Sequence, residues 1–266
     1  MAKIAFIGAG RMARAIAGGL LKQGSLMPAD IGCTSATDGT GTQLAADLGI
    51  TFSKELPLLL NEAEVVIIAC KPQQLNDLNS ELRTLTSGKL IISILAGTRI
   101  AKLRDCFPAA ANIVRTMPNT PGQIGAGVTA YTSEKPLEGD QHAHLQSMLN
   151  AMGQSYPVEE AQLDAVTAVS GSGPAYVFEF IAALRDAGIE AGLEAQTSRE
   201  LALHTVLGAA KLLEQSGDTP ENLRIAVTSP GGTTFAGLAA MEAAGFKPAI
   251  HAAVKAAKQR SQELSG

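Results

Sequence analysis

The sequence contains few of the residues that build disulfide frameworks and metal sites. Its 266 residues include no tryptophan, three cysteines and four histidines. The cysteines, Cys33, Cys70 and Cys106, are odd in number and widely spaced, which argues for a reducing compartment and against a disulfide framework. His142 and His144 are two positions apart in a helical pattern, so they point to different faces. We therefore predict no metal site.

Long apolar runs and an excess of positive charge are missing as well. No apolar run approaches the roughly 20 residues that span a bilayer. A strand-like run at residues 3–7 stands where a signal peptide would have its basic region. The 21 Lys and Arg and 25 Asp and Glu give a net charge of −4, which argues against nucleic-acid and membrane partners. We expect a cytoplasmic protein whose anionic ligands bind at local positive sites such as helix N-termini.

The residues that are present follow two patterns, which divide the chain. Over residues 1–158, apolar strand patterns alternate with helical ones, and this predicts a parallel sheet covered on both faces. The predicted strands are residues 4–7, 31–34, 65–70, 90–95, 113–115, 128–131 and 155–158, and the predicted helices are residues 12–23, 42–48, 73–85, 100–106 and 138–152. Over residues 159–266 only alanine-rich helical patterns remain. We predict an α/β domain followed by an all-α domain.

One helical stretch of the second domain predicts a partner subunit. Residues 176–184 are apolar nearly all round, with only Glu179 interrupting. Such a helix is buried on all sides. In a domain of about 105 residues, complete burial is most easily reached by packing against a second copy. The all-α domain is therefore predicted to form a homodimer, which could assemble further into an oligomer of dimers.

A glycine motif follows the first predicted strand directly and opens a helix. The residues Gly8-Ala9-Gly10-Arg11-Met12-Ala13 match the G-x-G-x-x-G/A pattern of dinucleotide-binding Rossmann folds. Gly8 permits a tight turn, Gly10 lets the backbone approach a pyrophosphate, and Ala13 allows close packing of helix on sheet. The alternative is a glycine-rich turn without a ligand. The position in a βαβ unit favours a Rossmann dinucleotide-binding domain.

Further candidate cofactor contacts lie where predicted strands end, since ligands collect at this edge of open α/β sheets. Together with Gly8, Ala9, Gly10, Arg11 and Met12, the predicted cofactor-binding residues are Thr34, Ser35, Ala69, Lys71, Pro72, Ala96, Gly97, Pro118 and Asn119. Lys71 could supply positive charge that the acidic chain otherwise lacks; the alternative is a solvated lysine at a strand end.

The end of the second strand bears on the choice between NADP and NAD. An acidic residue there would accept a hydrogen bond from the ribose 2′-hydroxyl of NAD. The chain instead has hydroxyl groups at Thr34, Ser35 and Thr37, and Asp38 comes late. This favours NADP, with NADPH as hydride donor, while NAD stays the alternative because no arginine follows to bind a 2′-phosphate.

A second glycine motif lies near the other end of the chain. Residues 229–234 read Ser-Pro-Gly-Gly-Thr-Thr and lead into a helix. Successive free N–H groups at a helix N-terminus, with two hydroxyls, form an anion site suited to a carboxylate. The alternative is an ordinary helix start in which Thr233 or Thr234 is the N-cap. Both interpretations stay open from the residues alone.

At this point the chain closely resembles the pyrroline-5-carboxylate reductase family. The resemblance covers essentially the whole chain and is carried by the Gly8 motif with Met12, Lys71-Pro72-Gln73, residues 93–97, Arg115-x-Met117-Pro118-Asn119-Thr120-Pro121, residues 170–176, and a long signature over residues 220–242. It implies NAD(P)H-dependent reduction of Δ1-pyrroline-5-carboxylate to L-proline, the last step of proline biosynthesis. One departure is the end of the second strand, where many members have a Ser/Thr-x-Arg pair and this chain lacks the arginine.

The resemblance also implies roles for the second glycine motif. Gly231, Gly232 and Thr233 match the loop that holds the substrate carboxylate, and Thr234 matches the hydroxyl that approaches the imine nitrogen. Thr234 is therefore the catalytic candidate, and residues 231–234 are the predicted substrate-binding residues. The implied fold is a Rossmann domain followed by a helical domain that intertwines with a second subunit.

Two alternative functions were compared with this one. β-Hydroxyacid dehydrogenases share the architecture and the Gly-Ser-Gly helix start, but they carry a catalytic lysine a few residues later. Here residues 171–173 are followed by Pro-Ala-Tyr-Val-Phe, without a lysine. A non-catalytic NADP-sensing regulator would need no anion site beside the nicotinamide, whereas residues 231–234 supply one.

Overall fold

A computed structural model describes residues 3–36, 38–78 and 80–265, so Thr37, a candidate contact named above, lies outside the described residues. By its internal contacts the chain divides into two compact units. The first comprises Met1–Ser172 with Ala257–Gly266, and the second comprises Gly173–Ala256. The domain boundary between residues 158 and 159 stays a prediction, because the unit that a residue contacts need not be the domain to which it belongs.

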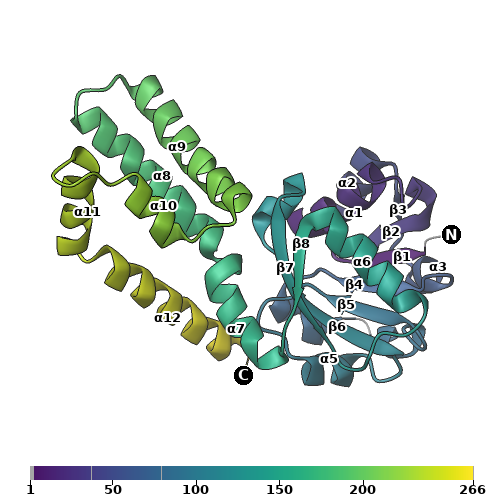
Figure 1. The fold of residues 1–266 in the computed structure, drawn as a ribbon. Coiled ribbons are helices and arrows are strands. Elements are labelled where there is room, and N and C mark those ends of the chain that lie inside the picture. The colour runs from purple at the N-terminus through teal and green to yellow at the C-terminus, as the bar shows by residue number, and fades with distance from the viewer. Residues whose placement is uncertain (1–2, 37, 79, 266) are drawn as a thin grey trace. The chain divides into compact units, whose positions relative to one another are not determined.

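The strands of the described residues form one eight-stranded sheet in the order β3-β2-β1-β4-β5-β6-β7-β8 (Figure 1). Their bounds are β1 (Ile4–Ile7), β2 (Ile31–Thr34), β3 (Thr51–Phe52), β4 (Val65–Ile68), β5 (Leu90–Ser93), β6 (Asn112–Met117), β7 (Gly127–Ser133) and β8 (Gly153–Pro157). Strands β1 to β6 are parallel to one another. Their order is that of a Rossmann fold, which reverses between β1 and β4.

The prediction of a wholly parallel sheet is wrong for the last two strands. β7 pairs antiparallel with β6, and β8 is parallel to β7. The chain between β6 and β7 holds only a short turn, η3 (Thr120–Ile124), which is too short for the crossover that a parallel neighbour needs. β3 was not predicted either, because a strand of two residues has no alternating pattern.

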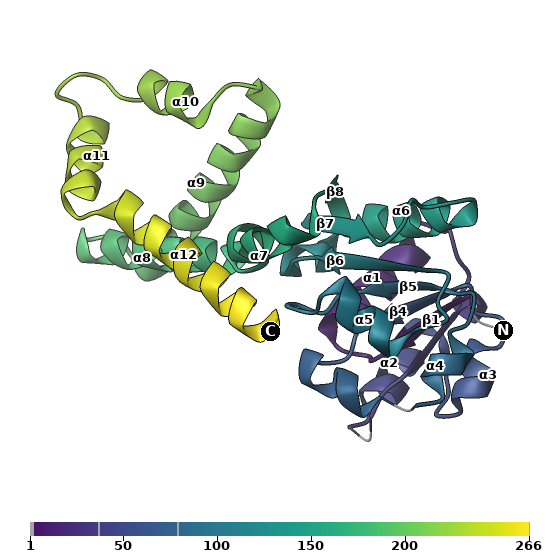
Figure 2. The same cartoon turned by 90° about the horizontal axis from the view of Figure 1, so that it is seen from below.

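Helices cover both faces of the sheet, and alternate strand residues face them (Figure 2). The helices of the first unit are α1 (Arg11–Lys22), α2 (Thr40–Leu48), α3 (Leu56–Leu60), α4 (Leu82–Leu85), α5 (Ile100–Cys106), α6 (Asp140–Met152) and α7 (Leu163–Val166). In β1, Ile4 and Phe6 lie in the core with α1 and α6, whereas Ala5 and Ile7 lie in the core with α3 and α5. Burial on both faces explains why these strands are apolar throughout.

The single helix predicted over residues 73–85 is wrong. The structure has a 3₁₀ segment, η2 (Pro72–Asp77), followed by the short helix α4. Pro72 opens the 3₁₀ segment, and Asn76 and Asp77 have side chains that compete for the backbone hydrogen bonds of a helix. The apolar residues Leu75 and Leu82 nevertheless contribute to the core, which is what gave the stretch its helical pattern.

The second unit is all helical in its described residues. It contains α8 (Gly173–Glu190), α9 (Ala195–Ser216), α10 (Pro220–Ala226), α11 (Thr233–Ala243) and the first part of α12 (Phe246–Ser265). α8 and α9 pack together, and the rings of Phe180 and Phe246 lie 6.2 Å apart between centroids. Within the part of the chain that is described, no helix is both long and apolar enough to cross a membrane.

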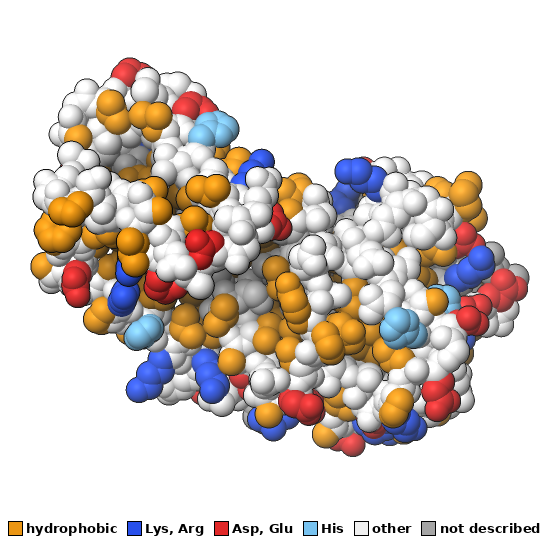
Figure 3. All heavy atoms as spheres, in the orientation of Figure 1, with side chains coloured by type: hydrophobic (Ala, Val, Ile, Leu, Met, Phe, Trp, Pro, Cys, Tyr) orange, Lys and Arg blue, Asp and Glu red, His pale blue; other side chains and the backbone are white. Residues whose placement is uncertain are grey.

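The second unit buries little of its apolar surface within one chain. α8 has no buried residue, and the side chains of Val177, Phe178, Phe180 and Leu184 are all exposed. Figure 3 shows apolar side chains gathered on the visible face of these helices. An apolar surface of this extent marks a site that another protein covers.

Candidate cofactor and substrate sites

A cleft of about 660 Å³ opens where β1, β2 and β4 end. It brings together seven of the predicted cofactor-binding residues, namely Gly8, Ala9, Gly10, Thr34, Ser35, Ala69 and Lys71. These residues follow three neighbouring strands, so the sheet order places them side by side. The site is the one that open α/β sheets use for nucleotides, outside the carboxyl ends of the strands where the order reverses.

Two glycines of this cleft are required for different reasons. Gly8 has a φ of 109°, and a Cβ there would lie 2.5 Å from backbone atoms of Ala69 and Cys70, so the fold itself needs glycine. Gly10, the N-cap of α1, has a φ of −74° that any residue adopts, and a Cβ there would meet no atom within 4 Å. The glycine at this position therefore leaves free space in front of a helix N-terminus, where a pyrophosphate fits.

The end of β2 is organised by hydrogen bonds at the start of α2. Ser35 Oγ accepts a hydrogen bond from the Gly41 N–H at 2.9 Å. Asp38 accepts one from the Thr40 hydroxyl at 2.8 Å and one from the Thr40 N–H at 3.1 Å. These bonds from Thr40 lower the pKa of the Asp38 carboxyl, so it carries a negative charge in the cleft at neutral pH.

Among the residues of this cleft that sequence reasoning missed, three polar ones lie near the end of β2. Asp38 and Thr40 line it, although Asp38 comes after the position where an acidic residue is expected. Lys54 lines it as well and follows β3. The signal for Lys54 would have been a lysine just beyond an edge strand beside β2, but β3 is too short to be recognised.

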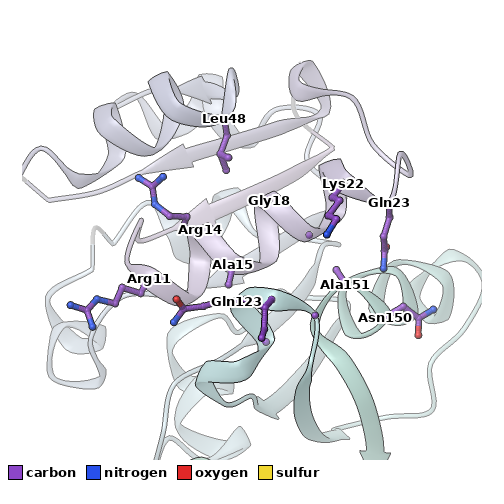
Figure 4. A pocket seen from close by; sticks show the side chains of 14 residues that line it. Arg11, Arg14, Ala15, Gly18, Lys22, Gln23, Leu48, Gln123, Asn150 and Ala151 are labelled. Atoms are coloured by element: carbon purple, nitrogen blue, oxygen red, sulfur yellow. The ribbon is translucent and has the colours of Figure 1, made fainter. Parts of the chain in front are cut away.

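The side chain of Arg11 lines a different cleft (Figure 4). This second cleft has a volume of about 590 Å³ and also includes Arg14 and Lys22 of α1 and the loop at residues 122–125. Arg14 forms an ion pair with Asp47 at 2.6 Å. The prediction that Arg11 contacts the cofactor therefore rests on its backbone N–H in the first turn of α1.

The other predicted cofactor residues do not line the first cleft. Met12 packs against the core, and Pro72 begins η2. Ala96, Gly97, Pro118 and Asn119 follow the paired strands β5 and β6. The Asn119 amide is engaged within the fold, since its oxygen accepts from the Val128 N–H at 2.9 Å and its nitrogen donates to the Ser170 carbonyl at 3.1 Å. Their roles toward a cofactor stay predictions.

A partly buried ion pair lies beside the sheet edge after β5 and β6. Arg115 is 5% exposed, and its Nη1 lies 3.2 Å from Oε1 of Glu160. The same oxygen accepts a hydrogen bond from the Ile100 N–H at 2.7 Å. Glu160 thus links β6 to the start of α5, the helix that follows residues 96–97.

The second glycine motif forms an N-terminus without a side-chain cap. Gly232 is the N-cap of α11, and no side chain accepts a hydrogen bond from the first turn. Thr233 and Thr234 are exposed, and neither hydroxyl has a hydrogen-bond partner among the described residues. The alternative in which one of them is the N-cap is therefore wrong. What remains is a helix N-terminus with free N–H groups and two free hydroxyls, which suits a carboxylate.

Comparisons with known proteins agree along the whole chain. One family model, described as NADP oxidoreductase coenzyme F420-dependent, matches residues 3–97, and another, described as pyrroline-5-carboxylate reductase dimerisation, matches residues 160–264. A pyrroline-5-carboxylate reductase of Synechocystis sp. is 41% identical over 98% of each chain. This chain belongs to the pyrroline-5-carboxylate reductase family.

Two solved structures of this family are similar over their full length. A pyrroline-5-carboxylate reductase from Coxiella burnetii has a TM-score of 0.90 and 33% identity and covers 100% of this chain and 99% of its own. The Plasmodium falciparum pyrroline carboxylate reductase, solved with NADP bound, has a TM-score of 0.87 and 29% identity, with 100% and 98% covered. The predicted family and the predicted fold class, a Rossmann domain followed by a helical domain, are confirmed.

Proposed function

We propose that this chain is a pyrroline-5-carboxylate reductase, which reduces Δ1-pyrroline-5-carboxylate to L-proline with NADPH as the last step of proline biosynthesis. The observation that carries the proposal is the 41% identity to a pyrroline-5-carboxylate reductase over 98% of both chains. Neither the β-hydroxyacid dehydrogenase nor the NADP-sensing regulator considered above is favoured by an observation on this chain.

The cleft at β1, β2 and β4 is the proposed cofactor site. The free space at Gly10 fits the pyrophosphate, whose oxygens would accept hydrogen bonds from the first N–H groups of α1. Lys71 lines the same cleft and adds positive charge. NADPH supplies the hydride when bound, and the protein supplies binding, orientation and electrostatics. NAD stays the alternative cofactor.

The N-terminus of α11 is the proposed substrate site. The backbone of Gly231, Gly232 and Thr233 would bind the substrate carboxylate, because it is an anion and the helix dipole is positive there. The Gly232 N–H donates to the Ser229 carbonyl at 3.0 Å, so the N–H groups of this loop that are free among the described residues are those of Gly231 and Thr233. Thr234 is the proposed catalytic residue. Its hydroxyl, which no other described group engages, would donate a hydrogen bond to the imine nitrogen, since the carbon accepts a hydride far more readily when that nitrogen is protonated or hydrogen-bonded.

The proposed assembly is a homodimer formed by the helical domain over residues 159–266. The exposed side chains of α8 and the match of residues 160–264 to a dimerisation family support it. The protein is proposed to be cytoplasmic, because the widely spaced free cysteines fit a reducing compartment.

A spectrophotometric assay of NADPH oxidation tests the proposed function. The full-length protein should oxidise NADPH when Δ1-pyrroline-5-carboxylate is added, and proline should form in equal amount. It should not reduce NADP with 3-hydroxyisobutyrate, the substrate type of the β-hydroxyacid dehydrogenases. Turnover of the hydroxy acid without turnover of the imine would reject the proposal.

A further inference from the structure

The cofactor cleft contains a lysine to which the sequence patterns assign no role. Lys54 lines the cleft together with Ser35, Asp38 and Thr40, at the end of β2. In Rossmann folds, the residues after the second strand contact the ribose 2′ position, which is the only place where NADP and NAD differ. This chain has no arginine after β2, so the usual positive charge is missing there.

We infer that Lys54 is the residue by which this chain selects NADPH, and that its ammonium group binds the 2′-phosphate from the neighbouring strand. The inference rests on the proposed function, because it concerns the cofactor of that reaction. It assigns the selectivity to the segment that follows β3, an edge strand that the cofactor motif does not include.

The strand register brings Lys54 beside the end of β2. β3 pairs parallel with β2, with Gly32 opposite Thr51 and Cys33 opposite Phe52. The Ser53 N–H then donates to the Cys33 carbonyl at 3.1 Å, so the two chains stay together beyond the strand ends. Counting on in the same register places Lys54 opposite Ser35, and neighbouring strands lie about 4.8 Å apart.

The ammonium group of Lys54 is available for a ligand. Lys54 is exposed, and among the described residues it has no hydrogen bond and no ion pair. The hydroxyl groups of Ser35 and Thr40 already have acceptors, because Ser35 Oγ donates to the Ala36 carbonyl at 3.2 Å and the Thr40 hydroxyl donates to Asp38. Lys54 is therefore the cationic group at this end of the cleft, and it can bind an added phosphate without losing an existing bond.

Asp38 sets a limit on the selectivity. Its carboxylate lines the same end of the cleft and carries a negative charge, which repels a 2′-phosphate and partly offsets the charge of Lys54. Both bonds from Thr40 go to Oδ1, so Oδ2 could still accept a hydrogen bond from the ribose hydroxyl of NAD. Lys54 and Asp38 together give a preference for NADPH that is real but moderate.

Substitution of these two residues in the full-length protein separates their effects. Lys54→Gln should lower kcat/KM for NADPH about 10- to 30-fold and change kcat/KM for NADH less than about twofold. Lys54→Arg should keep the preference. Asp38→Asn, which keeps an oxygen for Thr40, should raise the preference for NADPH about threefold. Lys22→Gln is the matched control: it removes a lysine of α1 that lies outside this cleft and should change neither cofactor.

Binding measurements give a readout that does not depend on turnover. Calorimetric titration with 2′,5′-ADP and with 5′-ADP should show that Lys54→Gln weakens only the first ligand, and more so at low salt. If Lys54→Gln weakens both ligands equally, or neither, Lys54 does not recognise the 2′-phosphate. If the parent protein binds 2′,5′-ADP through Lys54 but does not reduce the imine, the inference holds and the proposed function fails.

Discussion

The free space at Gly10 predicts a variant that loses the cofactor but keeps the fold. In Gly10→Ala, the added Cβ would meet no atom of the protein within 4 Å, and the φ of −74° suits alanine. An alanine at the N-cap destabilises the protein by up to about 1 kcal/mol relative to glycine. The same substitution lowers the conformational entropy of the unfolded chain, which stabilises the folded protein by about 0.4–1 kcal/mol. The free energy of unfolding without cofactor should therefore change by less than about 1 kcal/mol.

The same methyl group occupies the place of the pyrophosphate oxygens. Hydrogen bonds to a charged group contribute about 1.5–3 kcal/mol each, so displacing one or two of them should cost about 2–4 kcal/mol of binding. The dissociation constant for NADPH should rise about 30- to 1000-fold. Fluorescence titration with NADPH measures the affinity, and urea denaturation of the cofactor-free protein measures the stability.

Gly8→Ala is the matched comparison within the same turn. Its Cβ would lie 2.5 Å from backbone atoms of Ala69 and Cys70 at a φ of 109°. Backbone strain of about 1–3 kcal/mol and overpacking of about 1–3 kcal/mol should therefore destabilise the cofactor-free protein. The reasoning is refuted if Gly10→Ala binds NADPH like the parent, or if it loses as much stability as Gly8→Ala.

Three further predictions concern other parts of the chain. Thr234→Ala should lower kcat/KM about a hundredfold while stability and NADPH affinity stay unchanged, and Thr234→Ser should keep most of the activity. If Thr234→Ala turns over the imine at the parental rate, the hydroxyl is not used. Burial raises the pKa of the Cys70 thiol to about 11, so its alkylation by iodoacetamide should be slow at pH 8 and about tenfold faster for each pH unit above that. Because Cys70 lines the cofactor cleft, NADPH should block the reaction, which mass spectrometry can follow. Rapid alkylation at pH 8 would contradict this prediction. Ser261→Ala removes a buried 2.7 Å hydrogen bond to Asp164 and should cost about 1–3 kcal/mol in urea denaturation; an unchanged midpoint would mean that this bond contributes nothing.

The sequence predicted the cofactor turn well because its requirements are local. A glycine with positive φ and a helix that starts directly after a buried strand are visible within a few residues, and the structure has both at Gly8 and α1. The direction of β7 was not predictable in the same way, because an apolar strand pattern carries no information about which way the strand runs. The length of the connection from β6 was the available signal.

The parts of the site that were missed depend on long-range pairing. Lys54 reaches the cleft only because β3 pairs with β2, and a strand of two residues leaves no pattern. Asn119 lies at the predicted strand end, but its partners Val128 and Ser170 come from segments further along the chain, so its engagement within the fold could not be seen. Arg11 shows that a motif position fixes the backbone and leaves the direction of the side chain open.

The return of α12 to the first unit has a consequence for the order in which the protein folds during synthesis. Asp164 is buried against Ser261, which comes 97 residues later in the chain. At a synthesis rate of about 5–20 residues per second, the ribosome needs about 5–20 s to reach it. Throughout that time the Rossmann unit lacks its final helix contact, while the apolar helices from α8 onward emerge one after another. Those helices, with their exposed apolar α8 surface, are therefore made before the first unit can close.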